Sequence, residues 1–208
     1  DYTEYTKMLI GMIAIINPIG TIPIFMSLTT HMNIQERDQV ANTAPPAVFI
    51  ILLVSMLIGE MILEFFGITI SSFRVAGGIL IMLMAMAMMN GKTSSTKQTK
   101  AEMKESEHKE SITVVPLAIP LLAGPGAIST IILYTHKGSG VLHFLLVGLI
   151  ILIVSAILFL CFKSVRYISK YLSQTGVNVF TRIMGLILAA VAIEFLANGL
   201  KGLFPALA

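Results

Sequence analysis

The sequence predicts an all-α membrane protein with six transmembrane helices, and its composition is the first observation behind this expectation. Apolar residues make up 56% of the 208-residue chain, and charged residues make up 12%, against roughly 25% in an average soluble domain. The mean hydropathy is +0.88. Of the 14 basic and 11 acidic residues, nine lie between positions 91 and 111. A soluble domain spreads its charges over its surface, so this clustering excludes a soluble fold.

The second observation is a set of six charge-poor runs, each near the length of about 20 residues that a helix needs to cross a bilayer. They are Met8–Thr30, Gln39–Gly59, Val75–Gly91, Ile112–Thr135, Gly138–Phe162 and Ile183–Lys201. Ten Lys and Arg residues fall in or beside the first, third and fifth connections, and four fall on the other side. Short basic connections stay in the cytoplasm, so we expect a multi-pass membrane protein with both termini outside the cytoplasm.

The third observation is an internal repeat. A charged segment, 92–110, separates residues 1–91 from residues 111–208, and each part holds three predicted spans. Because three is odd, two similar halves must enter the membrane with opposite orientation, as in many secondary transporters. Pro18 and Pro125 are 107 positions apart, and Arg74 and Arg182 are 108 apart. We therefore predict two inverted three-helix repeats joined by a cytoplasmic linker.

Two Pro and Gly clusters indicate helix starts inside apolar spans. Asn17 before Pro18 has the pattern of a cap followed by proline at the first helical position, and Gly124 before Pro125 repeats it. A break in the middle of a span frees backbone groups that lipid cannot satisfy. Proline kinks repaired by neighbouring helices are the simpler alternative. Two breaks at matching positions favour a functional cavity bordered by broken first and fourth helices.

The helix starts provide the candidate substrate-binding residues. A helix N-terminus carries partial positive charge and free N–H groups, which suit an anion such as a carboxylate. Nearby hydroxyls and an amide add polar contacts, and the glycines leave room only for a small ligand. The candidates are Asn17, Pro18, Gly20, Thr21, Gly124, Pro125, Gly126, Ser129 and Thr130.

Three ionisable residues remain as candidates. Glu194 is the one carboxylate inside a predicted span, and it is the candidate for carrying a coupling proton; its alternative is a side chain that reaches the membrane surface. Arg74 and Arg182 begin equivalent predicted helices and have gating or structural roles. We expect Arg74 to pair with Glu60 or Glu64.

Several other functions are excluded. Basic residues form no stripe interleaved with aromatics, which excludes a nucleic-acid partner. The single cysteine, Cys161, cannot form an internal disulfide or a dithiol pair. No His-Glu-x-x-His motif is present, and the histidines have no partners at ligand spacing. The sequence therefore predicts no catalytic residue, no metal site and no cofactor, and we expect no enzymatic activity. The sequence does not indicate an oligomeric state.

The assembled motifs resemble the MarC family of integral membrane proteins, also called the neutral amino acid transporter family, and the resemblance covers essentially the whole chain. It rests on four segments, which are NPIGTIPIF from Asn17, FRVAGGIL from Phe73, PLAIPLLAGPGAIST from Pro116 and RIMGLIL from Arg182.

The resemblance implies a six-helix inner-membrane protein that moves small neutral amino acids such as glycine and alanine, with uptake coupled to protons. The helix starts predict the same kind of substrate. The expected mechanism is alternating access, in which the two halves rock about the site. The expected partners are thus a small neutral amino acid, protons and membrane lipid. An exporter or channel for drugs or small metabolites remains the alternative.

Overall fold

The computed structural model describes residues 2–29, 32–90, 122–168, 173–204 and 206, and these residues form helices and no strands. This confirms the all-α fold class. The predicted linker 92–110, and residues 112–121 of the predicted fourth span, lie outside the described residues. The helices are α1 (Tyr2–Ile16), α2 (Pro18–Leu28), α3 (Ile34–Phe65), α4 (Ile70–Met89), α7 (Pro125–His136), α8 (Val141–Ile168) and α9 (Gln174–Leu203).

Five stretches of the described chain are long and apolar enough to cross a membrane. They are Thr3–Ile22, Ile34–Phe65, Ile70–Met89, Val141–Val165 and Thr175–Leu203. Each overlaps one of the predicted spans. The fourth predicted span is represented by α7, which has 12 residues and is too short to cross a bilayer by itself.

Several helices are longer than the predicted spans because capping, rather than hydropathy, sets their ends. In α3 the side chain of Asn33 accepts from Glu36 N–H at 2.9 Å, and the Glu36 carboxylate accepts from Asn33 N–H at 2.8 Å. This reciprocal cap starts the helix at Ile34, before the apolar run begins. Ser173 caps α9 in a similar way by accepting from Gly176 N–H at 3.0 Å.

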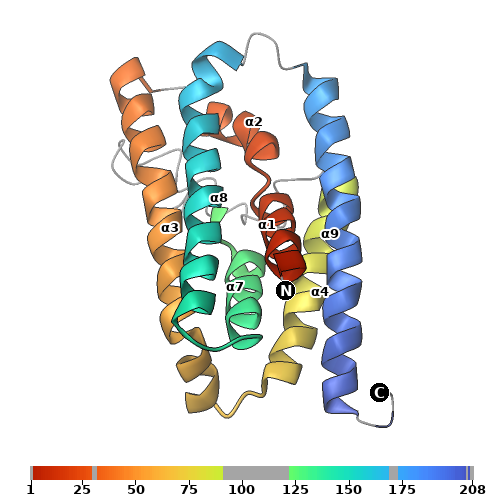
Figure 1. Ribbon diagram of the computed structural model, residues 1–208. Helices are drawn as coiled ribbons and strands as arrows, with labels where there is room; N and C mark the ends of the chain where they lie inside the picture. Colours follow the sequence, from red (N-terminus) through yellow and green to blue (C-terminus); the bar gives the residue numbers. More distant parts are fainter. Residues whose placement is uncertain (1, 30–31, 91–121, 169–172, 205, 207–208) are drawn as a thin grey trace.

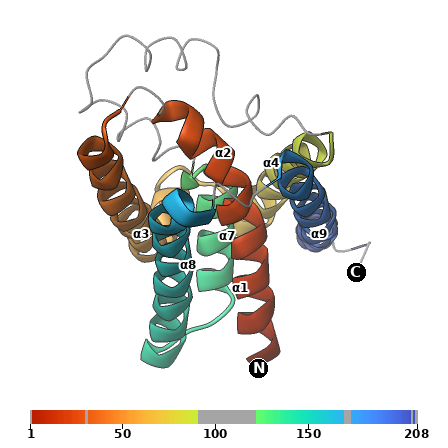
Figure 2. The ribbon, with the colours of Figure 1, turned by 90° about the horizontal axis from the view of Figure 1, so that it is seen from above.

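The helices form two outer pairs around a centre (Figures 1 and 2). Antiparallel α4 and α9 make the most extensive contact, and antiparallel α3 and α8 make the next. Between these pairs lie α1, α2 and α7. Helix α2 contacts α8 and α9, whereas α7 contacts α3 and α4. Each short helix therefore packs against long helices from the other half of the chain.

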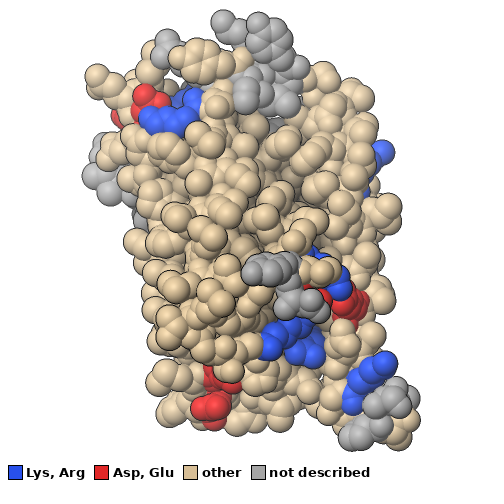
Figure 3. Space-filling view, viewed as in Figure 1, with Lys and Arg blue, Asp and Glu red and all other residues tan. Residues whose placement is uncertain are grey.

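The central helices are more deeply buried than the outer ones. In the α1–α2 stretch, 61% of the most apolar 18-residue segment is buried inside the protein, compared with 28% of the corresponding segments in α3, α4 and α9. Large apolar side chains are exposed along the outer helices, and Figure 3 shows a broad uncharged surface over most of this face, with charged side chains at the upper left, along the right side and near the lower end. Lipid is the solvent that such a surface requires.

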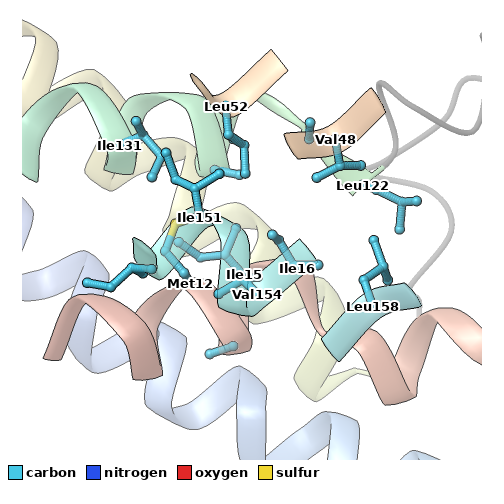
Figure 4. Packing of buried hydrophobic residues seen from close by; sticks show 14 of the residues in the cluster. Met12, Ile15, Ile16, Val48, Leu52, Leu122, Ile131, Ile151, Val154 and Leu158 are labelled. Atoms are coloured by element: carbon cyan, nitrogen blue, oxygen red, sulfur yellow. The ribbon is translucent and has the colours of Figure 1, made fainter. Parts of the chain in front are cut away.

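The core lies where the centre meets the outer pairs (Figure 4). Ile15 and Ile16 from α1 pack near Val154 and Leu158 from α8, and the same cluster includes Leu52 from α3. All five are buried. The apolar core therefore encloses the chain segment that leads into the α1–α2 junction.

The α4–α9 pair is held close by two glycines that make reciprocal contacts. A Cβ at Gly78 would lie 3.1 Å from the carbonyl oxygen of Ala192 in α9. A Cβ at Gly185 would lie 3.1 Å from the carbonyl oxygen of Ala85 in α4. A side chain at either position would push against backbone, so glycine permits this close approach.

The two reciprocal contacts share one spacing in the sequence. Gly78 and Gly185 are 107 positions apart, as are Ala85 and Ala192, and this is also the separation of Pro18 and Pro125. Arg74 and Arg182 are 108 positions apart, and their equivalence stays a prediction.

Candidate functional site

A single residue, Asn17, joins α1 to α2. Its backbone φ is +48°, in the left-handed region that Asn adopts more readily than most residues. Its side-chain Oδ1 accepts a hydrogen bond of 3.1 Å from Gly20 N–H, and the residue is 2% exposed. A Cβ at Gly20 would lie 2.7 Å from Asn17 Cγ. Glycine is therefore required where the Asn17 side chain folds over the first turn of α2.

Within the described chain, the first turn of α2 has one N–H donor without a partner and one hydroxyl oxygen that can accept a further hydrogen bond. Pro18 has no N–H, and the N–H of Ile19 has no hydrogen-bond partner among the residues that the structure describes. Buried Thr21 donates its hydroxyl hydrogen to the Pro18 carbonyl at 2.8 Å. Because that hydrogen is used, Thr21 Oγ1 can only accept from a further group.

Helix α7 begins with a similar arrangement. Gly124 precedes the helix without a side-chain cap, Pro125 is the first residue, and the Gly124 carbonyl accepts from Ala127 and Ile128 N–H at 2.9 and 3.1 Å. Within the described chain the N–H of Gly126 has no partner. Gly126 is buried, Gly124 is half-buried and Pro125 is exposed.

Two hydroxyls follow on the same helix. Ser129 and Thr130 are 3% and 0% exposed, and both donate to the Gly126 carbonyl, at 3.1 and 2.8 Å. Their oxygens, like that of Thr21, keep lone pairs but have no free hydrogen. Ile19 and Gly126, whose N–H groups lack partners in the described chain, are themselves 107 positions apart.

The structure brings the start of α7 against the end of α1. A Cβ at Gly126 would lie 3.7 Å from both Ile15 Cγ2 and Ile81 Cγ1, and 2.9 Å from Met84 Sδ. The carbonyls of Ile15 and Ile16 accept no hydrogen bond from the described residues. The start of α7, with the N–H donor of Gly126, therefore lies against the end of α1, whose last carbonyls have no donor among the described residues.

Sequence reasoning missed Ile81 and Met84 as walls of this site. A usable signal was present, because Gly77, Ile81, Met84 and Met88 repeat at three- and four-residue spacing along α4 and all face inward. A Cβ at Gly77 would lie 3.1 Å from Ser129 Oγ, which places this face of α4 against α7.

The ionisable candidates lie away from these helix starts. Glu194 is exposed on α9 and makes no hydrogen bond or ion pair with any described residue. Arg182 is exposed and Arg74 is half-buried. Arg74 forms no ion pair with Glu60 or Glu64, so that prediction is wrong. Glu60 lies 2.6 Å from His136 Nδ1 instead, because α3 and α7 end side by side.

A histidine anchors the far end of α7. Nε2 of His143 lies 3.2 and 3.1 Å from the carbonyl oxygens of Tyr134 and Thr135. Carbonyls only accept, so Nε2 carries the hydrogen, while Nδ1 lies 2.8 Å from the Tyr5 hydroxyl. At the end of α2, Arg37 donates to the Thr29 carbonyl at 3.3 Å. Each short helix is thus held at its C-terminus by a side chain of the helix that follows it.

A metal site is not formed by the described residues, in which no three His, Cys, Asp or Glu side chains gather. Cys161 is a free thiol on α8.

Comparison with known proteins places the chain in a family. A sequence model described as "MarC family integral membrane protein" matches residues 2–204. The chain belongs to the MarC family. This confirms the family expected from the four motifs and shows an integral membrane protein.

Curated MarC relatives come from bacteria and archaea. The UPF0056 membrane protein YhcE of Escherichia coli is 45% identical over 211 residues, covering 100% of this chain and 96% of the relative. YvbG of Bacillus subtilis is 42% identical, covering 99% and 98%. A UPF0056 membrane protein of Pyrococcus horikoshii is 43% identical, covering 93% and 92%. No solved structure matches the chain.

Proposed function

We propose that this MarC protein is a secondary transporter of small neutral amino acids that works by alternating access in the inner membrane and is coupled to protons. The observation that carries the proposal is the pair of helix starts at Pro18 and Pro125, where the N–H groups of Ile19 and Gly126 have no partner among the described residues. N-terminal helix ends bind anions through such groups and through the helix dipole.

The polar groups near the helix starts suit both ends of a zwitterion. The N–H groups of Ile19 and Gly126 can donate to a carboxylate. The hydroxyl oxygens of Thr21, Ser129 and Thr130 have their hydrogens committed, so they can accept from an ammonium, as can the carbonyls at the end of α1. No charged side chain is among these groups, which favours a ligand without net charge.

The size of the site supports a small substrate. A Cβ on Gly126 would lie 2.9 Å from Met84 Sδ and in contact with Ile15 and Ile81 at 3.7 Å, and Asn17 occupies the space beside Gly20. This close packing at both helix starts favours glycine and alanine over larger amino acids.

The packing of the two halves supports alternating access. The contact of α2 with α8 and α9 has its counterpart in the contact of α7 with α3 and α4, and the α4–α9 contacts repeat at a separation of 107. Such reciprocal contacts are expected of two inverted repeats, which can exchange two equivalent conformations about a central site.

Calorimetric titration of the purified full-length protein tests the substrate. We expect saturable binding of glycine and alanine. The Gly126→Leu substitution should abolish it, because the added side chain meets Ile15, Ile81 and Met84. Gly148→Leu is the matched control, since a Cβ at Gly148 meets nothing within 4 Å, and it should bind normally. Absence of saturable binding by the folded wild type would exclude the amino-acid substrate.

Transport assays in proteoliposomes test the mechanism and the coupling. An imposed pH gradient should drive accumulation of glycine in wild type and should fail in Glu194→Gln if Glu194 carries the proton. Accumulation in that variant at the wild-type level would remove Glu194 from coupling. Flux that does not saturate, or efflux of drugs without amino-acid uptake, would favour the channel or exporter alternative.

A further inference from the structure

A cavity of about 300 Å³ lies at the end of the α3–α8 pair, away from the central site. The beginning of α3 and the end of α8 form it. Its polar wall consists of Arg37, Asp38 and Lys163, and its apolar wall includes Ile34, Ala41 and Phe162. Figure 3 shows basic and acidic side chains together over the upper end of these helices, beside the uncharged surface.

The cavity lies where the apolar surface ends. On α8 the apolar run extends to Phe162 and is followed by Lys163; on α3 a polar first turn precedes the apolar run. Ile34, on the cavity wall, is 65% exposed. Side chains at such a boundary lie at the depth of the lipid headgroups. By the distribution of Lys and Arg, this is the cytoplasmic end, where anionic lipids are enriched.

The cations of the cavity are incompletely neutralised. Lys163 Nζ is 3.7 Å from the Asp38 carboxylate, and both side chains are partly exposed, so this pair is weak. Among the described residues, Arg37 uses its guanidinium for one hydrogen bond, to the Thr29 carbonyl, and its buried Nε has no partner. Two cations and one carboxylate leave a net positive charge beside an apolar wall.

We propose that this cavity binds the phosphodiester headgroup of an anionic phospholipid. Arg37 and Lys163 contact the phosphate, and guanidinium groups are well suited to phosphate oxygens. The glycerol backbone and the start of the acyl chains lie against Ile34, Ala41 and Phe162. Asp38 competes with the phosphate for Lys163 and thereby limits the affinity.

Native mass spectrometry of the full-length protein tests this assignment. Wild type should retain phosphatidylglycerol in preference to phosphatidylcholine when both are supplied equally. Lys163→Gln should lower retention by about tenfold, as expected when one charge-assisted hydrogen bond is lost. Arg182→Gln, which removes an exposed cation elsewhere, is the matched control and should retain lipid normally. Equal retention of the two lipids by wild type would overturn the proposal.

Asp38→Asn gives the sharper result, because its predicted effect is a gain. Removing the competing carboxylate should increase phosphatidylglycerol retention, which misfolding would not do. A zwitterionic ligand, such as phosphatidylethanolamine or an amino acid, would need Asp38 for its ammonium. Loss of binding in Asp38→Asn would therefore overturn the anionic assignment. Displacement of the lipid by millimolar inorganic phosphate would identify a soluble phosphate as the ligand and would also overturn it.

Discussion

At the scale of single residues, Asn17 combines two properties that few residues share. Its backbone lies in the left-handed region, and its side chain accepts from Gly20 N–H. Ala would lose the acceptor and would also be strained at this φ, whereas Gly would lose only the acceptor.

We therefore predict that Asn17→Gly lowers the free energy of unfolding by about 0.3 kcal/mol and that Asn17→Ala lowers it by about 1–2 kcal/mol more. This order reverses the one usual inside helices, where Ala is preferred over Gly. Chemical unfolding in detergent, followed by circular dichroism, measures both values. An alanine variant at least as stable as the glycine variant would contradict the left-handed assignment.

At this scale the sequence predicted the positions of the helix starts well and the partners of charged side chains less well. The expected helix starts are observed at Pro18 and Pro125, because the pattern of cap and proline acts locally. The partner of Glu60 could not be read in the same way. It depends on α7 ending beside α3, which places His136 within 2.6 Å and leaves Arg74 without a carboxylate partner in the described chain.

At the scale of elements, the most extensive helix–helix contact is the seam between α4 and α9. Gly78 and Gly185 face backbone carbonyls of the opposite helix, each at 3.1 Å from a Cβ placed on the glycine. Backbone cannot move aside as a flexible side chain can, so a methyl group at either position must separate the helices.

We predict that Gly78→Ala and Gly185→Ala each lower the free energy of unfolding by about 1–3 kcal/mol and do so to a similar extent, because the contacts are reciprocal. In Gly148→Ala, where the Cβ meets nothing, the same change should be neutral or stabilising by up to about 1 kcal/mol. Thermal unfolding of the three variants in one detergent provides the comparison. Strongly unequal losses of unfolding free energy in Gly78→Ala and Gly185→Ala would contradict the reciprocal contact of the two glycines.

At the scale of the whole molecule, the arrangement predicts a defined orientation in the membrane. The end of α7 and the start of α8 lie at one end of the bundle, and the end of α8 and the start of α9 lie at the other (Figure 1). Ser139 and Ser173 are exposed residues at these two ends.

We predict that, in a Cys161→Ser background, a Ser139→Cys protein reacts with a membrane-impermeant maleimide in intact cells. A Ser173→Cys protein should react only after the membrane is disrupted. The expectation rests on the basic residues near the end of α8 and the start of α9, because Lys and Arg in short connections favour the cytoplasmic side. Labelling with denatured protein controls for reactivity. The opposite pattern would invert the orientation and move the α3–α8 cavity to the outer leaflet.

The sequence by itself determined the membrane environment, the α-helical class, the family and the residues at which α2 and α7 begin. These properties follow from composition and from local hydrogen bonding, which act over a few neighbouring positions. The tertiary structure decided that α4 and α9 meet through Gly78 and Gly185, and that Ile81 and Met84 border Gly126. It also decided that Arg37 and Lys163 share a cavity. These facts depend on which helix faces meet across the bundle, and residues that are distant in sequence carry no local signal of that choice.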